Sequence, residues 1–306
     1  MHIFHKVVLQ SLKRNRTRTI VTIIGVLLSA AMITAVTTFG VSLLDYMVEG
    51  ATQKYGNWSA AFLDVDSSFV QERSCDKEVV DTVTFENVGY AKLKGGKNSK
   101  KPYLFIAGFS EKTFDSLPIT LTSGRLPKNN KEIIISGKIA TNGGVSYGLG
   151  DEISLTVGER TNGKKKLGQN VPFSSGKETF TAKGEKTYKV VGICRTPVFE
   201  EDFSPGYTVI TKADTKDGAR DLSLFVSLKN PRQVNSYVKN TADGHAYILN
   251  HYVLRLMGIS NDSADKVFLA LLYSFGGIVI AIIMVGSVFL VYNSFSISLN
   301  ERTRCV

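Results

Sequence analysis

Two long runs without a formal charge constrain this chain more than any other feature. The first, Thr19–Leu44, has 26 residues, and the second, Val267–Asn300, has 34 residues. A helix that spans a bilayer needs about 20 predominantly apolar residues, so each run is long enough to cross a membrane. The apolar core of a secretory signal is only about 7–15 residues long, which favours a retained anchor for the first run. The sequence therefore predicts two transmembrane helices that flank residues 45–266.

The positive charge of the chain follows the same division. Of the formal net charge of +10, residues 1–18 supply +5 and residues 301–306 supply +1, which leaves +4 for residues 45–266. Lys and Arg are enriched on the cytoplasmic flanks of membrane spans. We therefore expect both ends of the chain in the cytoplasm and residues 45–266 outside it. Because the spans explain the excess charge, no nucleic-acid partner is expected.

The first 18 residues have an apolar face of their own. Phe4, Val8 and Leu12 recur at a spacing of four, which is typical of one face of a helix. A cationic amphipathic helix beside a span is expected to lie in the interface plane, in contact with membrane lipid. The second span is also long: 34 helical residues measure about 51 Å, against a hydrocarbon core of about 30 Å. We therefore expect it to be extended as a stalk.

Residues 45–266 are predicted to form an α+β domain. Several short runs rich in β-branched and aromatic residues lie between clusters of Gly, Asn, Lys and Pro, which is typical of strands. Asn230 followed by Pro231 is a typical helix start. The predicted strands are AAFLDV (60–65), YLFIAGF (103–109), EIIIS (132–136), EISLTV (152–157), TYKVVGI (187–193), YTVIT (207–211) and LSLFVSL (222–228).

The sequence contains no motif for catalysis or for metal binding. The phosphate-binding pattern G-x-x-x-x-G-K-[ST] and the nucleophile pattern G-x-S-x-G are both absent. No Cys or carboxylate joins the His pairs at the spacing of a metal site. The carboxylates of Asp64, Asp66 and residues 200–202 are expected to be solvated. We therefore predict no catalytic, cofactor-binding or metal-binding residue, and the chain is predicted not to be an enzyme.

Two further features leave alternatives open. Cys75 and Cys194 share the external domain, where they either pair or remain free thiols, whereas Cys305 follows the second span. The basic stretches at 92–101 and 161–170 are expected to be solvated turns, with contact to an anionic partner as the alternative.

The order of these features resembles the FtsX/MacB-type permease subunits of ATP-binding-cassette transporters. The stretch SLKRNRTRTIVTIIGVLLSAAMI at 11–33 is similar to the start of that family. The stretch SGRLPKNNKEIIIS at 123–136 is similar to an external-domain pattern in which a turn precedes a Glu and a hydrophobic strand. The residues that match this structural motif are Gly124, Arg125, Pro127 and Glu132.

Three later motifs support the same resemblance. The stretches YGLGDEISLTV at 147–157 and KTYKVVGI at 186–193 resemble the strands that follow the turn motif. The stretch VYNSFSISLNERTR at 291–304 resembles the start of the FtsX-like core, where the second span enters a cytoplasmic coupling segment. The residues that this resemblance assigns to ATPase coupling are Glu301, Arg302, Thr303 and Arg304.

The resemblance implies a domain organisation of five parts. These are a cytoplasmic amphipathic helix (1–18), a transmembrane helix (19–44), an extracytoplasmic domain like the MacB periplasmic core (45–266), a second transmembrane helix (267–297) and the start of a coupling segment (298–306) that is expected to continue in a longer permease. It also implies a multi-pass protein of the bacterial plasma membrane.

The function implied is that of a permease subunit in an efflux or mechanotransmission system. It would couple ATP hydrolysis by a separate ATP-binding-cassette ATPase to movement of the external domain, with ATP and Mg²⁺ held by that partner and no cofactor on this chain. A second permease copy or half is a further implied partner, and the substrates of such systems include peptides, antibiotics and lipoproteins.

Two other functions have the same topology. One is a two-span receptor whose external domain binds a ligand and signals through the second helix. The other is a membrane-anchored binding domain, for which residues 298–306 would be the terminus.

Overall fold

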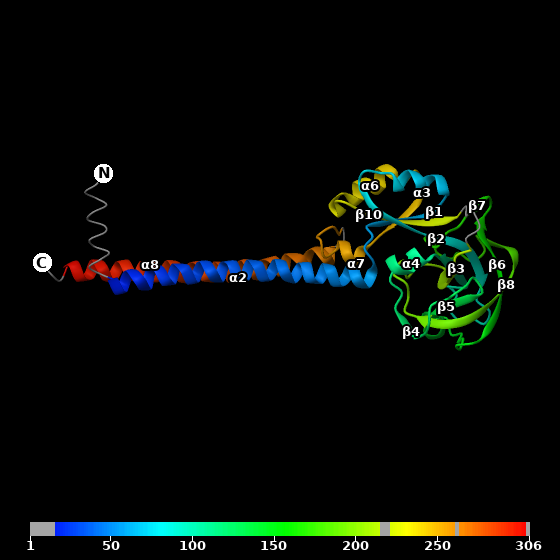
Figure 1. The fold of residues 1–306 in the computed structure, drawn as a ribbon, viewed down its shortest axis with the longest axis horizontal. Helices are drawn as coiled ribbons and strands as arrows, with labels where there is room; N and C mark the ends of the chain where they lie inside the picture. Colours follow the sequence, from blue (N-terminus) through cyan, green and yellow to red (C-terminus); the bar gives the residue numbers. More distant parts are fainter. Residues whose placement is uncertain (1–15, 215–220, 261–262, 304–306) are drawn as a thin grey trace. The chain divides into compact units, whose positions relative to one another are not determined.

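Two long helices and one globular unit make up the computed structural model of the chain (Figure 1). The structure describes residues 16–214, 221–260 and 263–303. It divides into a helical unit, residues 1–49 and 260–306, and a globular unit, residues 50–259. Most of the predicted amphipathic helix at 1–18 lies outside the described residues, and only its last three residues belong to the first long helix.

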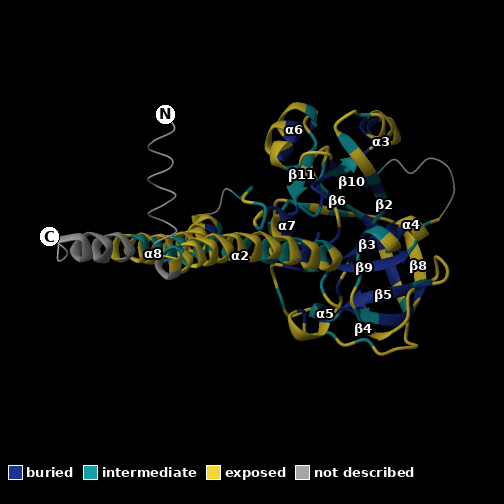
Figure 2. Ribbon diagram, turned by 60° about the vertical axis from the view of Figure 1, so that its left-hand side comes forward, coloured by how far each residue is buried: buried dark blue, intermediate teal, exposed yellow. Residues whose placement is uncertain are grey.

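The helical unit contains α8 (Ser263–Thr303), of 41 residues, and all but the last six residues of α2 (Arg16–Tyr55), of 40 residues. At the rise of an α-helix each is about 60 Å long, about twice the hydrocarbon thickness of a bilayer. Among the residues that the structure describes, Thr19–Tyr55 and Ser263–Asn293 are apolar segments long enough to span. Their apolar side chains are mostly exposed (Figure 2), as is expected of a surface that faces lipid. Two membrane helices that flank a mixed α/β domain are therefore confirmed.

The two helices lie side by side within the helical unit (Figures 1 and 2). At Gly25, a Cβ atom would lie 3.3 Å from Leu290 Cδ1. This small residue allows the α2 backbone to approach α8 closely, as small residues do in membrane helix pairs.

Over its described residues, the globular unit contains an eleven-stranded sheet with five short α-helices and one 3-10 helix beside it. All seven predicted strands are confirmed, and β2, β4, β7 and β11 were not predicted. The strands are β1 (Ala60–Val65), β2 (Val79–Lys92), β3 (Tyr103–Phe109), β4 (Leu121–Gly124), β5 (Glu132–Ser136), β6 (Glu152–Asn162), β7 (Lys165–Lys166), β8 (Thr179–Cys194), β9 (Gly206–Lys212), β10 (Leu222–Leu228) and β11 (Ala246–Leu249). The helices are α3 (Ser67–Ser74), α4 (Glu111–Ser116), α5 (Lys138–Thr141), η1 (Pro231–Gln233), α6 (Val234–Thr241) and α7 (His251–Leu254).

The first layer of the globular unit is a split β-α-β arrangement. β1, α3 and β2 form one half, and β10, α6 and β11 form the other, with the strand order β11-β1-β10-β2 and antiparallel pairing throughout. Helices α3 and α6 cover one face of this sheet, where Phe62, Phe69 and Tyr237 belong to a shared apolar core. The predicted helix start is confirmed, because the Asn230 side chain accepts a hydrogen bond from the backbone N–H of Arg232.

A six-stranded barrel forms the second layer and lies in the chain between β2 and β10. Its strand order is β2-β3-β9-β5-β8-β6, and the pairing of β2 with β6 closes it. The interior is filled by apolar side chains, so the barrel is a packed core and has no open channel. These are Ala91, Leu93, Leu104, Ile106, Ile133, Ile135, Ile139, Leu155, Val157, Tyr188, Val190, Tyr207 and Val209.

Two glycines allow the barrel to close. Gly89 has φ +136, a conformation that other residues rarely adopt, and it interrupts the regular register between β2 and β3. A Cβ on Gly89 would lie 2.7 Å from the carbonyl oxygen of Gly158 on β6. A Cβ on Gly158 would in turn lie 2.1 Å from the carbonyl oxygen of Thr181 on β8. The backbones at this seam are therefore too close for any side chain.

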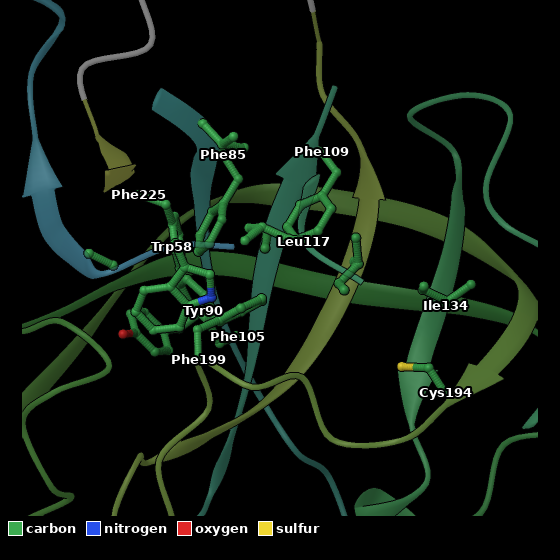
Figure 3. Packing of buried hydrophobic residues seen from close by; sticks show 14 of the residues in the cluster. Trp58, Phe85, Tyr90, Phe105, Phe109, Leu117, Ile134, Cys194, Phe199 and Phe225 are labelled. Carbon is green, nitrogen blue, oxygen red and sulfur yellow. The ribbon is translucent and has the colours of Figure 1, made fainter. Parts of the chain in front are cut away.

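An aromatic cluster joins the two layers (Figure 3). Because successive side chains of a strand point to opposite faces, β3 presents Leu104 and Ile106 to the barrel interior and Phe105 and Phe109 to this cluster. All seven residues of β3 are buried as a result. The members of the cluster that the figure labels are Trp58, Phe85, Tyr90, Phe105, Phe109, Leu117, Ile134, Cys194, Phe199 and Phe225.

We predict that Gly158→Ala destabilises the globular unit by at least about 1–3 kcal/mol, the usual cost of overpacking, because the new methyl group would meet fixed backbone atoms. Gly184→Ala in β8 is the matched control, since nothing lies within 4 Å of a Cβ at that position. Thermal unfolding of both variants measures the difference. Equal unfolding temperatures for the two variants would contradict the close approach at the seam.

Candidate functional site

The chain enters and leaves the globular unit at one place. It enters through the end of α2 at Tyr55, followed directly by β1, and it leaves through β11, followed directly by α7. β1 and β11 are antiparallel neighbours in the sheet, with Ala60 paired to Leu249. We call residues 55–59 and 250–254 the junction, because these two segments connect the sheet to the two long helices.

Asn250 holds the two segments of the junction together. It is 1% exposed, and its side-chain amide donates hydrogen bonds to the carbonyl oxygens of Gly56 and Trp58, both at 3.0 Å. Its backbone N–H donates to the carbonyl oxygen of Ser59 at 3.1 Å. Three hydrogen bonds from one residue therefore satisfy buried carbonyl groups that follow the end of α2, which would be costly to leave unpaired.

Aromatic contacts support the same junction. The rings of Tyr55 and Tyr252 stack with their centroids 4.3 Å apart. The indole N–H of Trp58 donates to the carbonyl oxygen of Tyr55 at 2.9 Å, and its ring meets Phe225 edge-on at 5.0 Å. Gly56, at φ +87, ends α2 in the conformation that glycine commonly supplies after a helix. The junction is thus both hydrogen-bonded and packed.

The predicted coupling residues lie at the other end of α8. Glu301, Arg302 and Thr303 are its last three residues, and Arg304 lies outside the described part of the chain. The structure describes no side-chain contact for these four residues, so their role stays a prediction.

The predicted external motif forms a local clip between β4 and β5. The guanidinium of Arg125 donates two hydrogen bonds to the Glu132 carboxylate, at 2.7 and 2.6 Å, and the backbone N–H of Lys128 donates to the same carboxylate at 2.8 Å. Pro127 is buried between them. Gly124 has φ +80, and a Cβ there would lie 2.3 Å from the carbonyl oxygen of Val191.

These contacts lower the pKa of Glu132 to about 2, mainly through the hydrogen bonds from Arg125 and then through the N–H of Lys128. The carboxylate is thus fully engaged in holding the turn. The structure thus brings the four residues of the predicted motif together in one turn. The only carboxylate among them, that of Glu132, is occupied by hydrogen bonds within the turn.

The expectation of solvated carboxylates is wrong for Asp64 and Glu200. Asp64 has φ +55 at an irregularity of β1, and it accepts a hydrogen bond from the Asn87 amide at 3.0 Å. Burial raises the pKa of Asp64. Glu200 is buried and binds the ammonium of Lys101 at 2.8 Å. Asp66 caps α3 by accepting from the backbone N–H of Phe69. Long-range partners, which the sequence does not display, account for the burial of Asp64 and Glu200.

A fully buried Arg160 was also missed by the sequence analysis. Its guanidinium donates to the Glu178 carboxylate at 2.7 and 3.1 Å and to the carbonyl oxygens of Gly168 and Val171. It lies over the ring of Tyr90 with 5.2 Å to the centroid. This network fastens the segment between β7 and β8 to the barrel. No local motif marks Arg160, because its partners are supplied by the fold.

The thiols of the globular unit remain unpaired. Cys75 is exposed and Cys194 is buried, so the free-thiol alternative holds. Burial raises the pKa of Cys194 to about 12. Among the residues that the structure describes, no group of three or more His, Cys, Asp or Glu side chains could hold a metal ion.

Comparison with known proteins identifies the family of this chain. The model of the MacB-like periplasmic core domain matches residues 19–242. No curated protein sequence matches the chain significantly.

Two similar solved structures are both external domains. The extracellular domain of the noncanonic ABC-type transporter YknZ from Gram-positive bacteria is 12% identical, with 63% of this chain and 99% of that chain covered and a TM-score of 0.31. The periplasmic region of MacB from Actinobacillus actinomycetemcomitans is 10% identical, with 69% of this chain and 97% of that chain covered and a TM-score of 0.35.

We predict that Asn250→Ala destabilises the globular unit by about 1–3 kcal/mol, because buried carbonyl oxygens lose their donors. The exposed Asn240→Ala in α6 is the control and is expected to change stability by less than about 0.5 kcal/mol. Denaturant unfolding of the two variants measures both values. An Asn250 variant as stable as the control would rule out this role for the amide.

The clip predicts a defined pH dependence. The folded pKa of Glu132 is about 2, below its unfolded value of about 4.3. The stabilisation is therefore complete above the unfolded pKa and is lost as the pH falls from about 4.3 towards 2. The unfolding temperatures of wild type and Glu132→Gln should differ at neutral pH and converge in acid. Glu185→Gln, at an exposed site, is the control. If the difference in unfolding temperature between wild type and Glu132→Gln stays constant down to pH ~2, the Glu132 carboxylate does not stabilise the turn as described.

Proposed function

Because this chain belongs to the family of the MacB-like periplasmic core domain, we propose that it couples ATP hydrolysis on a separate subunit to movement of its globular unit. It is an FtsX/MacB-type permease subunit of an ATP-binding-cassette system, a membrane protein with an extracytoplasmic domain. The family match carries the proposal, since it covers the first long helix and most of the globular unit.

The two helices support a mechanical role. Each has an apolar segment long enough to cross a bilayer, and each is longer than the hydrocarbon core requires. An α-helix of about 60 Å is a rigid element that carries displacement along its axis. The junction supports the same role. Asn250 and Tyr252, which follow β11, contact Gly56 and Tyr55 at the end of α2.

In this proposal the ATPase acts on the cytoplasmic end of α8. Glu301, Arg302 and Arg304 are charged residues at the foot of an apolar helix, where they would form charge-assisted hydrogen bonds with the partner. ATP and Mg²⁺ belong to that partner, and this chain performs no catalysis. A second permease copy or half completes the assembly. Peptides, antibiotics and lipoproteins are the substrate classes proposed, for either efflux or mechanotransmission.

A charge-reversal variant tests the coupling. The double change Glu301→Lys with Arg302→Glu keeps the net charge while reversing the proposed contacts. We expect the ATPase that co-purifies with the wild-type chain to lose its stimulation by the permease, measured as phosphate release in membranes or nanodiscs.

The matched control is Lys177→Glu with Glu185→Lys, two exposed positions of the globular unit, which should leave stimulation unchanged. If the Glu301/Arg302 variant stimulates the ATPase as well as wild type does, the coupling role of this segment is wrong. If no ATP-binding-cassette ATPase associates with the wild-type chain, the proposed function itself fails.

A further inference from the structure

One end of the barrel carries polar and charged residues at positions that face inward. Strand side chains alternate between the two faces, so a residue two positions from a member of the interior core points to the same side. Lys186 is two positions from Tyr188, and Thr211 is two positions from Val209. Lys131 precedes β5 and lies two positions from Ile133. Lys186 lies on β8 and Thr211 on β9, and β5, which Lys131 directly precedes, lies between these two strands in the sheet.

The neighbouring strands complete this rim. Glu86 of β2 pairs with Gly108 of β3, and Gly108 pairs with Thr211 of β9, so the three positions face the same side. A Cβ on Gly108 would lie 3.2 Å from Glu86 Oε2. The missing side chain therefore leaves space beside the Glu86 carboxylate.

The rim surrounds a hollow of about 430 Å³, within the size range of small-molecule sites, which also occur in the mouths of barrels. We call this hollow the barrel mouth. Its lining is mostly polar and comes from three strands, β2, β8 and β9, and from the residues that precede β5 and follow β9. The lining includes Glu86, Lys131, Lys186, Tyr188, Thr211 and Asp214.

Tyr188 places a hydroxyl group at the floor of the barrel mouth. The residue is 2% exposed, and within the described part of the chain its hydroxyl forms no hydrogen bond. The Thr211 hydroxyl, in contrast, donates to the carbonyl oxygen of Glu132 at 2.9 Å. Burial, together with the nearby Glu86, raises the pKa of Tyr188 to about 12. At neutral pH the phenol therefore keeps its proton and can donate it in a hydrogen bond to a ligand.

The lysines of the barrel mouth are not all neutralised. Lys212 pairs with Glu111 at 2.9 Å, whereas Lys131 and Lys186 form no ion pair with any described residue. Two acids also line the hollow. Burial raises the pKa of Glu86, an effect that the charge of Lys186 opposes, and Asp214 is exposed at the edge. Two lysines that form no ion pair within the described residues therefore line the same hollow as a phenol donor.

We propose that the barrel mouth binds the oxyanion of a small ligand, a carboxylate or a phosphate group, through Lys131, Lys186 and the Tyr188 hydroxyl. Charge-assisted hydrogen bonds from ammonium groups to such oxygens are short and strong. Glu86 would accept from a hydroxyl or amide group of the same ligand. Binding at this site needs no ATPase, so its test does not depend on the proposed coupling function.

Equilibrium dialysis of the detergent-solubilised chain tests the proposal, with radiolabelled glycerol 3-phosphate and N-acetylalanine as the two probes. Saturable binding of the first identifies a phosphate ligand, and saturable binding of the second identifies a carboxylate ligand. Lys131→Gln and Lys186→Gln should each weaken binding roughly tenfold, the usual effect of losing one hydrogen bond to a charged group. Tyr188→Phe should weaken it several-fold while keeping the shape of the core.

Lys189→Gln is the matched control, because Lys189 is the next residue after Tyr188 on β8, is exposed, and points away from the barrel interior. It removes the same charge and should leave binding unchanged. The proposal is overturned if neither probe binds saturably at millimolar concentration. It is also overturned if Lys189→Gln weakens binding as much as Lys186→Gln, since the attraction would then come from net charge alone. Thermal unfolding establishes that each variant is folded.

Discussion

The hydrogen bonds from the buried Asn250 amide fix where the globular unit begins and ends. They join the exit of α2 to the segment after β11, and the adjacent pairing of Ala60 with Leu249 continues the contact into the sheet. The strands β1 and β11 belong to the first of two packed layers. The split β-α-β sheet packs through an aromatic cluster onto the barrel, and β2 belongs to both. The junction is therefore part of one continuously packed structure.

Local sequence patterns were sufficient for the elements that each bury one continuous apolar run. The seven predicted strands belong to this class, the two spans were found from the length of their uncharged runs, and the Asn230 helix start was found from its capping residues. β2 was missed although it is the strand that connects the layers. Its 14 residues include Asp81, Glu86 and Asn87 and a register change near Gly89. It pairs with β10 in one half and with β3 and β6 in the other, so no single alternation runs along it. The barrel followed from pairing between distant segments and was therefore invisible in the sequence.

The candidate sites show the same limit. Arg125 and Glu132 lie seven residues apart in one motif, which its resemblance to a family pattern marked as structural, and the structure adds the ion pair between them. Asn250 and Gly56 lie 194 residues apart, and nothing beside Asn250 in the sequence marks it as the residue that joins the two ends. Likewise, nothing in the sequence distinguishes Lys186 from other strand lysines. Only the barrel core shows that its side chain lies on the inward face of β8. The family resemblance thus marked a local motif, whereas contacts that depend on topology required the structure.

The most direct test of the account is whether ATP hydrolysis moves the globular unit through the junction. Cys75 is exposed and unpaired, so a fluorophore on this residue, in a chain with Cys305→Ser, reports on the globular unit of the assembled complex. The account predicts an ATP-dependent change in the fluorescence of the wild-type complex. It predicts that Asn250→Ala, studied below its unfolding temperature, loses this change while ATPase stimulation persists. An unchanged signal in the Asn250 variant, or no ATP-dependent signal in the wild type, would contradict the claim that the helices drive the globular unit through this junction.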